Sequence, residues 1–140
     1  MRKTALVIGL LAAVTALPGA DAAMVSYKAT LAGTSEVPPV TTGGKGTAAV
    51  NVDTATKQLS WRVEYSGLSG PPAAAHIHCG AVAGANAGVA IPLGDKFNSP
   101  ITGSAAMTDA QLADLQAGKC YVNVHTAANK GGEVRGQLTP

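Results

Sequence analysis

The chain has 140 residues, with ten Lys or Arg against eight Asp or Glu and a formal net charge of +2. So small a charge lacks the electrostatic signature of nucleic-acid binding or of strong adhesion to an anionic membrane, and we expect neither partner. The length suits one domain with a single hydrophobic core rather than two domains.

Residues 1–22 have the pattern of a secretory signal peptide. A basic start is followed by the apolar run 6–14 and by a small-x-small end at 20–22. Such an apolar run is too short to span a bilayer, and the combination is typical of a cleaved export signal. We therefore expect a periplasmic or secreted protein whose mature part is one domain, residues 23–140.

The mature part consists mainly of short segments in which apolar and polar residues alternate, as in half-buried strands. Turn residues at 53–56 join two of these segments into an expected hairpin. The two prolines of 34–40 favour an extended, edge-like connection. The expected strands are 24–33, 46–52, 59–65, 75–79, 89–93, about 99–107, 119–126 and 132–138.

One short helix is expected at 108–118. Thr108 and Gln111 have the spacing of a capping box, Leu112 and Leu115 share a helical face, and Gly118 is a natural stop. Many short strands with a single helix predict an all-β fold, a Greek-key β-sandwich of the immunoglobulin-like or superoxide-dismutase-like type.

All three histidines and both cysteines of the chain fall in two short stretches, 75–80 and 119–126. Alternate residues of a strand share a face, so His76 and His78 point to one side while Ile77 and Cys79 point to the other.

The same alternation in the second stretch places Tyr121, Asn123 and His125 together. The opposite face is apolar and reads as core, so we expect both cysteines on the buried side and the imidazoles on the outer side. If the two strands are neighbours, the three histidines meet.

Imidazole is the commonest protein ligand for zinc, copper and similar metals. A pair like His76 and His78 alone is more often a solvated or hydrogen-bonded surface feature. His125 and the absence of any other histidine favour a metal site, made of His76, His78 and His125. Three protein ligands would leave one coordination position open, for chemistry or simply for holding the ion.

Cys79 and Cys120 can form part of a zinc site, remain a pair of buried thiols or form a disulfide. Export into an oxidising compartment favours the last of these, because the two residues lie on matching faces of two strands. We therefore predict a disulfide between Cys79 and Cys120.

Several motifs together resemble the CHRD domain family, which is named from repeats in chordin and is widespread in exported bacterial proteins. They run in order along nearly the whole mature chain, and the resemblance implies a single CHRD domain over 23–140. The matching segments are Glu36-Val37-Pro38-Pro39, Gly67-Leu68, Ala75-His76-Ile77-His78, the run 121–126 and the run 131–136.

A weaker resemblance is to the copper and zinc superoxide dismutases, which also carry an H-x-H strand and a later Val-His. It implies that His76, His78 and His125 are copper ligands and that Arg135 guides a small anion such as superoxide. Those enzymes bridge copper to zinc through a further histidine, and this chain has none left. A mononuclear copper site is therefore the expectation, without that route of proton delivery.

Arg135 and Glu133 are two residues apart and are expected on the same face of the last strand. Arg135 could attract the anion, with Glu133 orienting it or a ligating histidine. The alternatives are a surface ion pair or a structural arginine that bonds loop carbonyls. Asn123, beside His125, is equally suited to anchoring a loop.

Three functions follow from these residues. The favoured one is an exported copper protein with a three-histidine site and superoxide dismutase-like redox activity. The second is a three-histidine zinc site that activates water. The third is a non-catalytic extracellular interaction module, against which the scarcity of aromatic residues counts.

Overall fold

The computed structural model describes residues 23–140, so the predicted signal peptide lies outside the described part. No helix in this part is long and apolar enough to cross a membrane. The strands are β1 Met24–Ala32, β2 Lys45–Asp53, β3 Gln58–Ser66, β4 Pro72–Cys79, β5 Val89–Pro92, β6 Ile101–Ala106, β7 Cys120–Thr126 and β8 Val134–Gln137; a 3-10 turn follows β1 at Gly33–Ser35, and the helix α1 is Asp109–Gln116.

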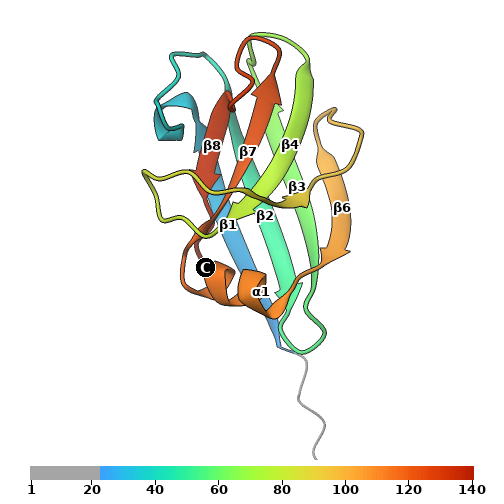
Figure 1. Ribbon diagram of the computed structural model, residues 1–140. Coiled ribbons are helices and arrows are strands. Elements are labelled where there is room, and N and C mark those ends of the chain that lie inside the picture. The colour runs from blue at the N-terminus through green and yellow to red at the C-terminus, as the bar shows by residue number, and fades with distance from the viewer. Residues whose placement is uncertain (1–22) are drawn as a thin grey trace, which may run out of the picture.

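The eight strands form one antiparallel sheet in the order β5-β4-β7-β8-β1-β2-β3-β6. The sheet folds over, so that β4, β7 and β8 lie across the core from β1, β2 and β3 (Figure 1). The chain crosses between these two halves after β3, after β5 and again through α1, as Greek-key connections do. The predicted all-β sandwich with one short helix is confirmed.

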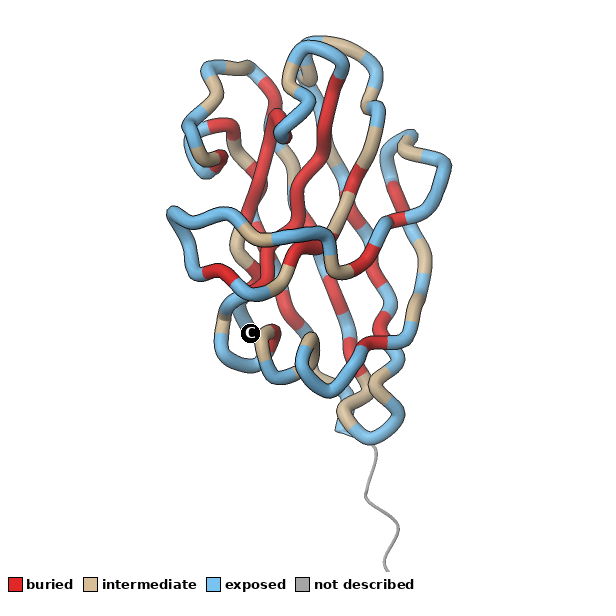
Figure 2. Tube along the Cα trace, in the orientation of Figure 1, coloured by how far each residue is buried: buried red, intermediate tan, exposed pale blue. Residues whose placement is uncertain are grey.

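The core follows directly from the alternation in the sequence. In β2 and β3 every second residue is buried, and Figure 2 shows the buried positions recurring along both halves of the sheet. Trp61, the chain's one tryptophan, is a core residue. It faces Gly103 on β6, where an added Cβ would lie 2.4 Å from the indole ring, so only glycine leaves room for it.

The helix begins as its sequence predicts. The Thr108 side chain accepts from the backbone N–H of Gln111, and the Gln111 side chain accepts from the backbone N–H of Thr108, which completes the capping box.

The ends of some strands differ from the prediction. β1 stops at Ala32 because the chain turns into the 3-10 segment, and β8 begins only at Val134. Gly132, with a φ of +126°, lies in the left-handed region, so the chain bends just before β8. Glu133 therefore lies outside the strand in which it was expected.

Candidate metal site

The histidines are brought together by the pairing of β4 with β7, which are antiparallel neighbours. His78 lies opposite Tyr121, His76 opposite Asn123, and Ala74 opposite His125. His125 is therefore the diagonal neighbour of His76 on the same face, within reach of a long side chain. The two strands are thus neighbours, which is the condition for the histidines to meet, and the predicted shared face is confirmed.

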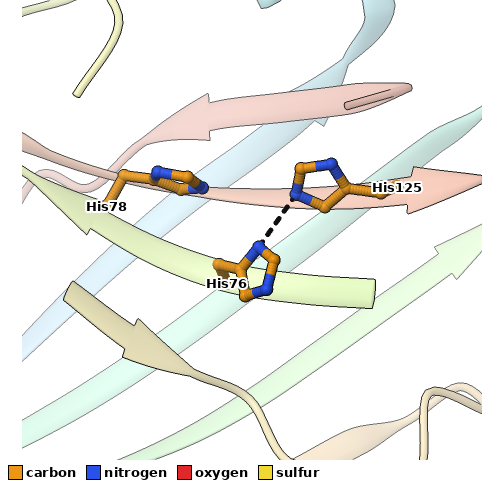
Figure 3. Close-up of side chains that lie close together, drawn as sticks. All are labelled: His76, His78 and His125. Atoms are coloured by element: carbon orange, nitrogen blue, oxygen red, sulfur yellow. Dashed lines mark hydrogen bonds between the residues drawn. The ribbon is translucent and has the colours of Figure 1, made fainter. Parts of the chain in front are cut away.

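The three imidazoles lie close together on one face of β4 and β7 (Figure 3). One ring nitrogen from each of His76, His78 and His125 lies within 4.8 Å of the other two. The closest contact, from His76 Nδ1 to His125 Nε2, is 3.0 Å. Two nitrogens bound to one ion at about 2.0–2.1 Å would lie roughly 3 Å apart, so this pair already has the spacing of two ligands.

Backbone carbonyls select the nitrogen that each buried ring presents. His78 Nδ1 lies 2.9 Å from Ala87 O, and His125 Nδ1 lies 2.9 Å from Lys130 O. A backbone carbonyl can only accept, so both Nδ1 atoms carry the hydrogen and Nε2 is left as the atom for a metal. His125 Nε2 then accepts a hydrogen bond from His76 Nδ1, and a bound metal would take the place of the shared hydrogen between these two nitrogens. Such carbonyl partners are typical of histidines that bind metals.

Asn123 contacts the nitrogen of His78 that faces the cluster, at 3.0 Å between Nε2 and Oδ1. Its Nδ2 donates to Gly131 O at 3.4 Å. An unprotonated Nε2 needs a donor, so the amide must be turned about its last bond to present Nδ2 to His78, and the bond from Nδ2 to Gly131 O is then lost. Asn123 therefore anchors the loop after β7 in one orientation of its amide, as one of its two predicted functions requires, and competes with a metal for His78 in the other.

The electrostatics of the cluster favour the neutral form of His76 and of His125. Burial lowers the pKa of His76, and the neighbouring His125 and His78 lower it further. Burial also lowers the pKa of His125, and His78 adds to this, against an opposite effect of the hydrogen bond to Lys130. At neutral pH these two imidazoles are therefore uncharged, which is the form that coordinates a metal.

The histidines lie on the face of the sheet opposite the core, as predicted, but this outer face is largely covered rather than open to solvent. His78 and His125 are each only 8% exposed, and His76 is half-buried. The reason is that loops fold back over the strands, since 80–88 supplies the carbonyl to His78 and 127–133 supplies the one to His125. His76 is thus the ring through which the cluster meets the surface.

The disulfide between Cys79 and Cys120 is present, as predicted. The two residues are directly opposite in the pairing of β4 with β7, with their Cα atoms 4.1 Å apart. Cys79 immediately follows His78, so the bond joins the two strands at the end of the histidine face.

Arg135 occupies the position of a structural arginine. It is 1% exposed, and it donates from Nη1 to Asn86 Oδ1 at 3.0 Å and from Nη2 to Ala85 O at 2.6 Å. Within residues 23–140 the salt bridges are Lys57–Asp109 and Arg62–Glu64, so Arg135 forms no surface ion pair. The alternative of an arginine that bonds loop oxygens is the one seen, and guidance of an anion stays a prediction.

Glu133 turns away from Arg135, and the expectation of a shared face is wrong. Because Glu133 precedes β8, the alternation of that strand does not apply to it. Its carboxylate is fully buried and accepts hydrogen bonds from Thr42, Ser69 and Thr126 rather than contacting a histidine. Burial alone would raise the pKa of Glu133, but these hydrogen bonds outweigh it and lower the pKa to about 2.

Glu36 is a buried carboxyl near the site that the alternation pattern of the sequence does not predict. It is 4% exposed, and its Oε1 has no hydrogen-bond partner among the described residues. Burial raises the pKa of Glu36 to about 7, against the opposing effects of Arg135 and Asn123. The only signal in the sequence is Glu36-Val37-Pro38-Pro39, a motif of the family resemblance that says nothing of burial.

We predict that Glu36→Gln stabilises the protein at alkaline pH. A pKa raised from 4.5 to about 7 means that the folded state favours the protonated carboxyl, so Glu36 costs stability progressively as the pH rises between these values. The variant should gain roughly 1–3 kcal/mol in unfolding free energy at pH 8 and little at pH 4. Urea unfolding at both pH values measures this, with the exposed Glu64→Gln as the matched control. Equal pH dependence in wild type and Glu36→Gln would contradict it.

The fold and the site together define a small all-β protein, an antiparallel β-sandwich with three imidazoles on one pair of strands that could hold a metal ion. The chain belongs to the CHRD domain family, whose sequence model matches residues 27–138. No curated protein and no solved structure matches the chain. The resemblance to superoxide dismutases therefore gains no support from known structures.

Proposed function

We propose that the protein holds one metal ion on His76, His78 and His125, and that this ion is copper. The observation that carries the proposal is the convergence of three ring nitrogens within 4.8 Å, with the tautomers of His78 and His125 set by backbone carbonyls. An all-imidazole donor set suits copper and zinc rather than magnesium or calcium, and at equal geometry copper binds more tightly than zinc. Zinc is the second candidate, because three imidazoles with one open position also form catalytic zinc sites.

A bound copper ion would supply one-electron chemistry and a position for a small anion such as superoxide. The contributions of the chain are to fix the rings, to exclude water from His78 and His125, and to leave the half-buried His76 toward the surface. A superoxide dismutase-like activity is therefore a proposal that depends on copper binding. Because the chain has only three histidines, the site is proposed as mononuclear.

Calorimetric titration of Cu(II) into the mature, disulfide-bonded protein tests the proposal. We expect one ion per chain in the wild type and at least ~100-fold weaker binding in His125→Ala, since one of three ligands is lost. Asn51→Ala, an exposed position on β2, is the matched control and should bind as the wild type does. Equal affinity of His125→Ala and wild type would refute the site.

Three further measurements separate the alternatives. An axial Cu(II) electron paramagnetic resonance signal with nitrogen coupling is expected if imidazoles are the ligands. Metal analysis of protein isolated from its own compartment distinguishes copper from zinc. Capture of a protein partner that survives complete removal of metal would instead favour the non-catalytic interaction module.

We also propose that the protein is exported to the periplasm or beyond the cell. The disulfide supports an oxidising compartment, and the pattern of residues 1–22 supports a cleaved signal. Mass spectrometry of the protein isolated from the culture should show a mature chain that begins at residue 23. An intact residue 1 in cytoplasmic protein would contradict the proposal.

A further inference from the structure

Arg135 is a buried cation that forms no direct ion pair among residues 23–140. Burying a guanidinium is costly unless its hydrogen-bonding groups and its charge are met. Two of its N–H groups are used by Asn86 and by the carbonyl of Ala85. Its planar face is used by an aromatic ring, since Cζ lies 3.4 Å from the centroid of Tyr121.

Tyr121 also stacks on His78. The two ring centroids are 4.7 Å apart and the ring planes differ by only 4°. β7, which carries Tyr121, lies between β4 with His78 and β8 with Arg135. The three planar groups therefore follow one another across three neighbouring strands, with Tyr121 in contact with both Arg135 and His78.

A second path joins Arg135 to the same imidazole through loop 80–88. Arg135 fastens this loop at Ala85 and Asn86. The next residue, Ala87, donates its backbone N–H to Tyr121 Oη at 3.2 Å and accepts from His78 Nδ1 with its carbonyl. The carbonyl that sets the His78 tautomer thus belongs to the segment that Arg135 holds in place.

We propose that Arg135 is a positioning residue for His78. Arg135 holds the Tyr121 ring and loop 80–88 in place, so that His78 keeps its ring plane and presents Nε2 to the other two histidines. Arg135 itself does not contact the three-histidine cluster in this scheme. The expected effect on metal affinity rests on the proposed metal site. The orientation and tautomer of His78 can be measured in the metal-free protein as well.

Arginine is suited to this function in a way that other residues are not. Lysine keeps the charge but has neither the flat face for Tyr121 nor the fork that reaches two loop oxygens. Methionine fills a similar volume without any donor. A residue that merely fills the core could be replaced by methionine with an effect on stability alone.

The test compares Arg135→Lys and Arg135→Met with wild type in the full mature chain. In the metal-free proteins at pH 8, long-range ¹H–¹⁵N correlation spectra of the histidine side chains report the tautomer of His78. We expect the Nδ1–H form in wild type and a mixture of both tautomers in the two variants. Arg62→Met, which removes an exposed arginine on β3, is the matched control and should keep the wild-type spectrum.

Cu(II) titration of the same proteins gives the second readout. Loss of an outer partner of a ligating histidine typically weakens metal binding by about 10–100-fold, and we expect this range for both variants. If Arg135→Met does not fold, Arg135→Lys and Tyr121→Phe carry the test. Tyr121→Phe keeps the ring but loses both hydrogen bonds between the hydroxyl and the backbone of Ala87.

The outcomes separate this inference from the metal proposal. A wild type that binds no copper would defeat the proposed function, while the tautomer spectra would still decide the function of Arg135. A folded variant with the wild-type His78 tautomer and wild-type copper affinity would overturn the inference and leave the metal site standing.

Discussion

Removing the disulfide by Cys79→Ala with Cys120→Ala is expected to lower the free energy of unfolding by about 4 kcal/mol. The bond closes a loop over a sequence separation of 41, and the chain entropy that such a cross-link removes from the unfolded state corresponds to about that value. For a single domain this is a large part of the total stability. Urea unfolding followed by fluorescence of the single tryptophan measures the change.

The reductant supplies the control for this prediction. Adding dithiothreitol should lower the urea midpoint of the wild type and leave that of the double alanine variant unchanged. Equal midpoints of the oxidised wild type and the variant would show that the bond contributes nothing to stability.

Glu133→Gln should cost about 3 kcal/mol or more at neutral pH. One carboxylate oxygen accepts from Thr42 and from the backbone of Ser69, and the other from the hydroxyls of Ser69 and Thr126 and from Asn129. Glutamine turns one of these acceptors into a donor that faces other donors, inside a fully buried site. Hydrogen bonds to a charged group are worth about 1.5–3 kcal/mol each, so losing two is enough.

The pH dependence gives this prediction its sign. Because the folded pKa of Glu133 is about 2, below the unfolded value near 4.5, its stabilising effect is complete above pH 4.5 and is lost as the pH falls toward 2. The wild type should therefore lose stability over this range faster than Glu133→Gln does. Glu64→Gln, on the exposed side of β3, should show the pH dependence of the wild type. If Glu133→Gln shows it too, the Glu133 carboxylate does not stabilise the segments around Thr42 and Ser69.

The parts of the site that the sequence predicts are those that depend only on alternation along strands. The H-x-H pair of β4 and His125 of β7 share a face because every second residue does, and Cys79 meets Cys120 for the same reason on the neighbouring positions. Hydrophobic alternation likewise predicts the core of β2 and β3, including Trp61.

The parts that the sequence does not predict depend on loops. The carbonyls of Ala87 and Lys130 set the two tautomers, but a backbone carbonyl leaves no mark in the residue type. The sequence predicts a strand over 132–138, but β8 begins at Val134, one residue after Glu133. Because Glu133 lies outside the strand, its side chain contacts Ser69 and Thr126 and does not face Arg135. Burial of His78 has the same origin, since loop 80–88 carries no apolar signal strong enough to predict that it covers a face.

The order of the strands leaves β5 and β6 at the two ends of the sheet, where unpaired backbone groups could recruit a strand from another molecule. β5 has four residues and ends at Pro92, which has no N–H to offer to an incoming chain. β6 has six residues and includes Gly103, which weakens pairing. Both edge strands are therefore poor templates for the addition of strands from other molecules, and a concentrated solution of the folded protein is expected to resist fibril formation.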